Sequence, residues 1–178
     1  MTAAGLASRT AGLARVGALA AILGGALRIV SSFIPYEANS APLEALYGVI
    51  DVCFVFALIA IYIAGAEVVG LAGLAAFLLA MTGLASIVGP DAQAFGIDFY
   101  RVGALVFVIG LAGLSVQLLR ARMMAPSALL WIGTLAASLV SAMLPQAFMA
   151  TGVLIGAGFV LAGVGMLRLR VLPAFAAA

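Results

Sequence analysis

The chain contains no lysine and no histidine, and its only cysteine, Cys53, lies inside a hydrophobic segment. A disulfide framework is therefore excluded, and a zinc site or a haem held by histidine lacks its usual nitrogen and sulfur ligands. The most common general base and the amine for Schiff-base chemistry are also missing. We therefore expect a protein that is not an enzyme and that holds no metal or other cofactor.

Charged residues are scarce too, at 8% of the 178 residues, whereas 67% are hydrophobic. The mean hydropathy of +1.35 is too high for a soluble domain, which needs a largely polar exterior. The net charge of +2 is small and dispersed, so nucleic acid is not an expected partner. The composition predicts a multi-pass membrane protein whose main partner is the lipid bilayer.

Hydrophobic runs divide the chain into six predicted membrane helices. Each approaches the roughly 20 residues needed to cross about 30 Å of hydrocarbon. Between the second and third runs, the only interruption is Gly65-Ala66-Glu67. We therefore predict one all-α transmembrane domain over residues 1–178, with helices at about 10–34, 42–63, 67–88, 100–119, 126–144 and 148–167.

The arginines indicate the orientation of these helices. If the N-terminus is cytoplasmic, six arginines lie on the inner side and two, Arg28 and Arg101, on the outer half, which satisfies the positive-inside rule. Both termini are then cytoplasmic, and Tyr62 and Trp131 are expected at the inner interface. A composition rich in Ala, Gly and Arg fits a GC-rich bacterial genome. We therefore predict a bacterial plasma (inner) membrane protein.

Three prolines, Pro35, Pro90 and Pro145, are spaced 55 residues apart, and each follows a predicted outward-going helix. This spacing predicts three tandem helical hairpins, at roughly 10–64, 65–119 and 126–170. Two alternatives remain open: the register is accidental, or the repeat is inverted. The pentapeptide Arg-Val-Gly-Ala-Leu, which begins at Arg15 and again at Arg101, is the evidence for an inverted arrangement of three plus three helices.

The first predicted hairpin carries charged residues within its hydrophobic runs. Arg28 precedes the turn, and Glu44, Tyr47 and Asp51 follow it at helical spacing on one stripe. Arg28 and Asp51 are both about 9–10 Å below the same membrane boundary at a rise of 1.5 Å per residue. Because charges inside a bilayer normally find a partner, we expect Arg28 to pair with Asp51. The group is either a structural ion pair or a site for an ion, a proton or a polar head group.

The last predicted helix is rich in glycine. Gly152, Gly156, Gly158 and Gly163 allow another helix to approach closely, within the bundle or in a second subunit. Two functions follow from these features. We favour an accessory subunit that packs in a larger membrane complex, or in a homo-oligomer, through this face. The alternative is a small transporter or a solute- or ion-binding protein with its polar site on the outer half of the first two helices.

The predicted topology has a direct test. In a variant that lacks Cys53, a single cysteine introduced at Gln93 should react with a membrane-impermeant maleimide added from outside the cell, because residues 89–99 form an outer loop in this topology. Labelling from the cytoplasmic side alone would rule out the orientation.

Overall fold

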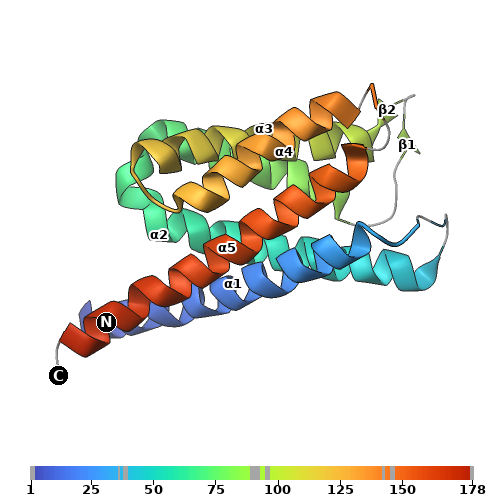
Figure 1. Ribbon diagram of the computed structural model, residues 1–178. Helices are drawn as coiled ribbons and strands as arrows, with labels where there is room; N and C mark the ends of the chain where they lie inside the picture. Colours follow the sequence, from blue (N-terminus) through green and yellow to red (C-terminus); the bar gives the residue numbers. More distant parts are fainter. Residues whose placement is uncertain are drawn as a thin grey trace.

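The structure is a computed structural model that describes residues 3–35, 37, 40–88, 93–94, 97–141, 143–144 and 147–176 (Figure 1). Side chains are described between Gly12 and Arg168 within these ranges, apart from Gln93, Ala94 and Ile97. The described part consists of five helices and one pair of two-residue strands: α1 (Ala3–Ser31), α2 (Ala41–Ile87), β1 (Gln93–Ala94), β2 (Ile97–Asp98), α3 (Phe99–Arg120), α4 (Ala125–Ser141) and α5 (Ala147–Ala176). The two strands pair antiparallel just before α3.

The prediction of a helical, apolar chain is confirmed in this coarse form. Four of the described helices, α1, α2, α3 and α5, are long and apolar enough to cross a membrane. Their outward faces carry large hydrophobic side chains such as Leu19, Phe56 and Leu161, each at least 43% exposed. Such faces are suited to lipid rather than to water.

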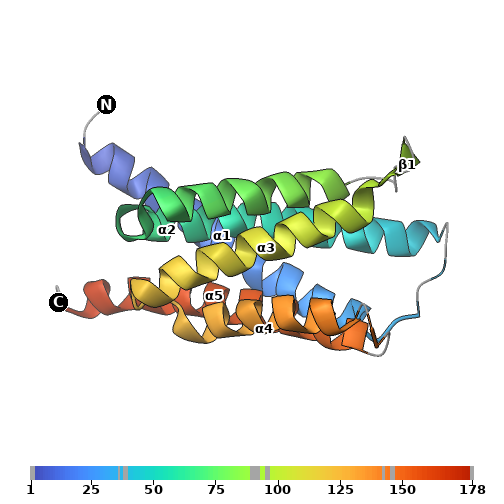
Figure 2. The same ribbon diagram turned by 90° about the horizontal axis from the view of Figure 1, so that it is seen from above.

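The longest helix, α2, reverses direction at Gly70. Its 47 residues would extend about 70 Å if straight, more than twice the hydrocarbon thickness of a bilayer. Gly70 has φ 60° and ψ −165°, a conformation that is essentially restricted to glycine. The rings of Tyr62 and Phe77, on either side of Gly70, stack with their centroids 4.5 Å apart. Residues 41–69 and 71–87 therefore form two arms that lie side by side (Figures 1 and 2).

The expected helix boundary at residues 65–67 is therefore wrong. Helical structure continues through Gly65 and Glu67 and is interrupted only at Gly70. Gly65 is buried, and a Cβ atom there would lie 3.5 Å from the side chain of Leu118 on α3. A glycine that serves helix packing looks the same in the sequence as a glycine that ends a helix.

The six separate helices and the tandem hairpin repeat are also not what the described structure shows. It contains five helices, of 29, 47, 22, 17 and 30 residues, which do not divide the chain into equal hairpins. Pro35 does follow α1, whereas Pro90 and Pro145 lie outside the described residues. Proline marks where a helix stops, but it does not fix helix length or symmetry.

The helical segments form a closed bundle. α1 packs against α5 and the first arm of α2, the second arm packs against α3, and α4 packs against α3 and α5. Figure 1 shows the start of α1 and the end of α5 at the same end of the bundle as the reversal in α2. The end of α1, the start of α2 and the two strands lie at the opposite end, which we call the Arg28 end.

Neighbouring helices approach closely where side chains are absent or small. A Cβ atom on Gly25 of α1 would lie 2.5 Å from the carbonyl oxygen of Gly156 on α5. In the same way, a Cβ atom on Gly156 would lie 2.5 Å from the carbonyl oxygen of Gly25. Gly83 on the second arm of α2 similarly meets the backbone of Phe107 on α3. Lipid supplies no hydrophobic driving force between helices, so such close backbone packing is a main source of their association.

The four glycines that the sequence offered for a partner are used inside the chain. Gly152, Gly156 and Gly163 are buried against α1, and Gly158 is buried against the indole of Trp131 on α4. The close approach predicted for these residues is present within one chain. A second subunit that docks on the same four glycines would have to displace α1 or α4.

Aromatic side chains join four of the five helices in the bundle core. Phe54 on α2 stacks on Phe159 on α5 at 4.1 Å between ring centroids and lies 6.3 Å from Phe107 on α3. Trp131 on α4 lies 5.1 Å from Phe159 and is fully buried. The indole faces the core because Gly158, which has no side chain, leaves room for it inside the bundle.

The contact between α1 and α5 predicts that an alanine substitution has different effects at two glycines of α5. A Cβ atom on Gly165 would have no neighbour within 4 Å, so Gly165→Ala should leave stability unchanged or raise it by about 0.5–1 kcal/mol, the usual helical gain over glycine. Gly156→Ala should lower stability by about 1–3 kcal/mol, because the methyl group would collide with α1. Thermal unfolding in detergent measures both variants. If the two variants change Tm equally, the close contact of Gly156 with α1 does not contribute to stability.

Candidate functional site

Arg28 lies in the last turn of α1, at the helix end where a cation is favoured by the helix dipole. The carbonyl groups of a last turn lack partners within the helix, and here backbone N–H groups of the next turn supply them, including the N–H of Ser32, which donates to the Arg28 carbonyl oxygen at 3.2 Å. The hydroxyl groups of Ser31 and Ser32 both donate to the carbonyl oxygen of Arg28, at 3.0 and 2.8 Å. These bonds close the end of α1, and the guanidinium group extends beyond it.

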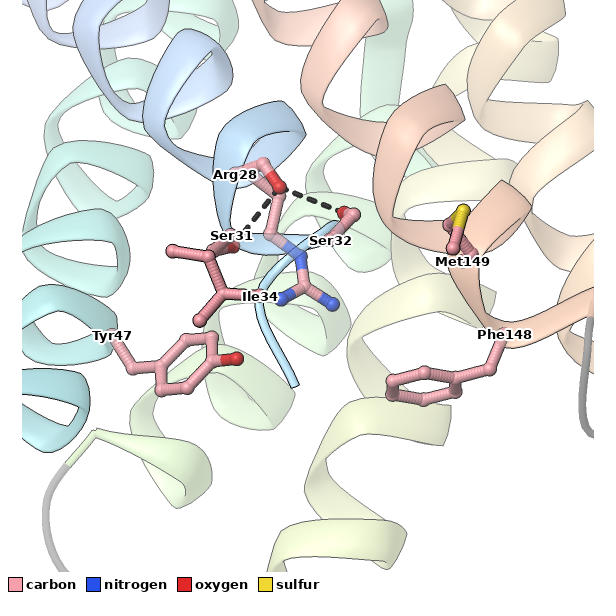
Figure 3. Close-up of a pocket in the computed structure, with 7 residues that line it drawn as sticks. All are labelled: Arg28, Ser31, Ser32, Ile34, Tyr47, Phe148 and Met149. Carbon is pink, nitrogen blue, oxygen red and sulfur yellow. Dashed lines mark hydrogen bonds between the residues drawn. The ribbon is translucent and has the colours of Figure 1, made fainter. Parts of the chain in front are cut away.

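A cavity of about 130 Å³ lies at the Arg28 end, between α1, the start of α2 and the start of α5. Figure 3 shows the guanidinium group of Arg28 directed into it, between the side chains of Tyr47 and Phe148. The lining residues are Arg28, Ser31, Ser32, Ile34, Tyr47, Phe148 and Met149. We call this cavity the Arg28 pocket.

Arg28 and Tyr47, two of the four predicted site residues, meet in the Arg28 pocket. The guanidinium carbon is 5.9 Å from the centre of the Tyr47 ring, which is within the range of a cation–π interaction. Such a contact contributes about 0.5–2 kcal/mol, depending on how far both groups are removed from water. The contact does not neutralise the arginine.

The other two predicted residues, Glu44 and Asp51, do not pair with Arg28. Within the described part of the chain, neither carboxylate is within 4.0 Å of an arginine nitrogen. Asp51 is partly buried, and it interacts electrostatically with Arg28 at a distance, without a direct contact. Glu44 is exposed in the first turn of α2, where the helix dipole favours a carboxylate. The expected Arg28–Asp51 ion pair is therefore not formed as a direct contact.

The ion pair that the described residues do form lies elsewhere at the same end. Arg101 Nε is 3.1 Å from Asp98 Oδ2, and the Arg101 side chain is 86% exposed. Asp98 is the N-cap of α3 and accepts a hydrogen bond from the backbone N–H of Arg101 at 3.0 Å. Exposed pairs of this kind contribute about 0–1 kcal/mol. Arg101 thus provides a neutralised arginine for comparison with Arg28.

Sequence reasoning missed the contribution of α5 to the pocket. Phe148 is the first residue of the predicted helix 148–167, which does not identify its neighbours, and Met149 and Ser32 carry no signal. Their proximity to Arg28 depends on Gly152, where a Cβ atom would contact the Ser32 hydroxyl and lie 3.4 Å from an Arg28 guanidinium nitrogen. A contact between residues so far apart in the sequence has no local pattern.

The chemistry of the pocket suits an anion. Its charged group is a cation with five N–H donors, and no carboxylate of the described residues lines it. In the same part of the chain, no three side chains of His, Cys, Asp or Glu gather to hold a metal ion. An arginine in such a setting is the usual ligand for a carboxylate or a phosphate group.

No protein-family model matches this chain, and no curated protein or solved structure was found to be significantly similar to it.

The absence of a direct contact between Arg28 and Asp51 predicts weak coupling between them. In a double-mutant cycle of Arg28→Leu and Asp51→Leu, the coupling energy should be below about 1 kcal/mol, whereas breaking a direct buried pair costs roughly 3–5 kcal/mol. Denaturant or thermal unfolding of the four proteins in one detergent measures it. If both single changes are severe and the double change restores stability, the two side chains do pair in the membrane.

Proposed function

We propose that this chain is a multi-pass protein of the bacterial plasma membrane that crosses the bilayer six times, with both termini in the cytoplasm. The reversal at Gly70 supports this number, since each arm of α2 then crosses once. The arginine distribution supports the orientation: α3 ends at Arg120, and Figure 1 shows that end of α3 at the end of the bundle that holds both termini. In this proposal the crossings pair as three hairpins of unequal length, α1 with the first arm of α2, the second arm with α3, and the shorter apolar helix α4 with α5.

We further propose that the protein is not an enzyme and acts as a binding protein for an anionic group, with the Arg28 pocket as its site. One observation carries this proposal: within the described part of the chain, the Arg28 guanidinium borders a cavity and makes no ion pair. A charged group at membrane depth costs about 2.5–3.5 kcal/mol or more when it lacks a partner. A bound anion would remove that cost.

This proposal belongs to the solute-binding class, which the sequence left as the alternative. The accessory-subunit interpretation relied on Gly152, Gly156, Gly158 and Gly163 as a docking face, and these are buried within the chain. A membrane partner would therefore need another surface. The accessory role remains a second proposal. Purification in mild detergent distinguishes the two, because an accessory subunit should co-purify with a fixed partner protein.

The binding proposal is tested with Arg28→Gln and its matched control Arg101→Gln. Wild-type protein in an uncharged detergent should be stabilised by a mixture of polar lipid extract and phosphate, by about 2–4 °C in Tm for each kcal/mol of binding free energy. Arg101→Gln should respond as the wild type does, because that arginine is already neutralised by Asp98. Arg28→Gln should not respond.

An identical response of all three proteins would contradict a binding role for Arg28. A second protein that remains bound through purification, together with no response to the mixture, would instead favour the accessory subunit.

A further inference from the structure

The size of the Arg28 pocket limits what can occupy it. Sites for drug-sized or cofactor-sized ligands are usually about 300–1,000 Å³, and this cavity is about 130 Å³. A nucleotide or a vitamin is therefore too large to enter. A single carboxylate or phosphate group fits, and any remainder of the ligand must lie outside the cavity.

The polar groups of the pocket are unevenly distributed. The Ser31 and Ser32 hydroxyl protons are used by the carbonyl oxygen of Arg28, so they are not free to donate to a ligand. The donors that remain are the guanidinium N–H groups and the Tyr47 hydroxyl. These donors form one polar side, which suits an oxyanion held by charge-assisted hydrogen bonds.

The opposite side of the pocket is apolar and open to the exterior of the bundle. Phe148 and Met149 on α5 are 59% and 48% exposed. These side chains adjoin apolar helices that are suited to lipid, and Phe148 and Met149 stand opposite the guanidinium group in Figure 3. A ligand with one charged end and one apolar end would satisfy both sides.

We infer that the Arg28 pocket binds the oxyanion head group of an amphiphile, a phosphate or carboxylate, while its acyl chains stay outside against Phe148 and Met149. This inference rests on the proposed anion-binding function and adds the class of ligand. A free phosphate shares the head-group chemistry but lacks the part that contacts the apolar side. The two sources are therefore separable by experiment.

The test uses three probes on purified protein in an uncharged detergent: phosphatidylglycerol, phosphatidylcholine and glycerol phosphate. Phosphatidylglycerol should raise Tm by about 2 °C or more at saturation, and the other two should raise it less at the same concentration. The choline group of phosphatidylcholine places a second cation near Arg28, and glycerol phosphate has no acyl chain. Native mass spectrometry of retained lipid gives an independent readout.

Two pairs of variants locate the binding. Arg28→Gln should weaken phosphatidylglycerol binding about tenfold or more, and Arg28→Lys, which keeps a cation, should weaken it less. Phe148→Ser should weaken binding of the lipid without changing the response to glycerol phosphate. Phe33→Ser is its matched control, because Phe33 is 62% exposed at the same end and does not line the pocket.

The outcomes separate this inference from the function on which it rests. An Arg28-dependent response to glycerol phosphate that equals the response to the lipid would overturn the amphiphile and leave an anion-binding site. A lipid response that is the same with and without Arg28 would overturn the inference, because the lipid then binds elsewhere. If no probe gives an Arg28-dependent response, both the inference and the proposed function fail.

Discussion

Close contact between helix backbones is the constraint on which the rest of this structure depends. Glycine at Gly25 and Gly156 lets α1 and α5 approach until each Cβ position is filled by a carbonyl oxygen of the other helix. The same contact extends to Gly152, which lies beside Ser32 and Arg28. The pocket therefore exists because α5 can approach the end of α1 this closely. Larger side chains at these positions would separate Phe148 and Met149 from the arginine.

The reversal at Gly70 has a comparable effect on the opposite side of the bundle. A glycine at φ 60° allows one long apolar helix to return on itself, and the two arms are held together by the stacked rings of Tyr62 and Phe77. The reversal returns the second arm beside the first, and the first arm, which precedes Gly70, lies along α1 and carries Tyr47, whose ring centre is 5.9 Å from the Arg28 guanidinium carbon.

Arg28 and Asp51 show that two charged residues predicted at the same depth in a membrane need not contact each other. Sequence spacing predicts that Arg28 and Asp51 lie at matching depth on consecutive helices, and it places Tyr47 and Asp51 on one stripe. Rotation of α2 about its axis decides which member of that stripe faces α1, and spacing along one helix does not contain this information. In the structure the Tyr47 ring meets the guanidinium, whereas Asp51 makes no ion pair with it among the described residues. Arg28 is consequently left to a cavity rather than to a carboxylate.

The sequence by itself determined the apolar, helical fold class and the positions of most helix ends, because hydropathy, length and proline act locally along the chain. It also identified Arg28 as a residue that requires a partner. Only the tertiary structure decided that Gly70, rather than Gly65, reverses the chain, that Trp131 is buried, and that the glycines of α5 contact α1 and α4. Glycine has the same local properties in a turn, in a close helix contact and on a free surface. Which of these it serves depends on neighbours that are distant in sequence, and the Arg28 pocket is made by such neighbours.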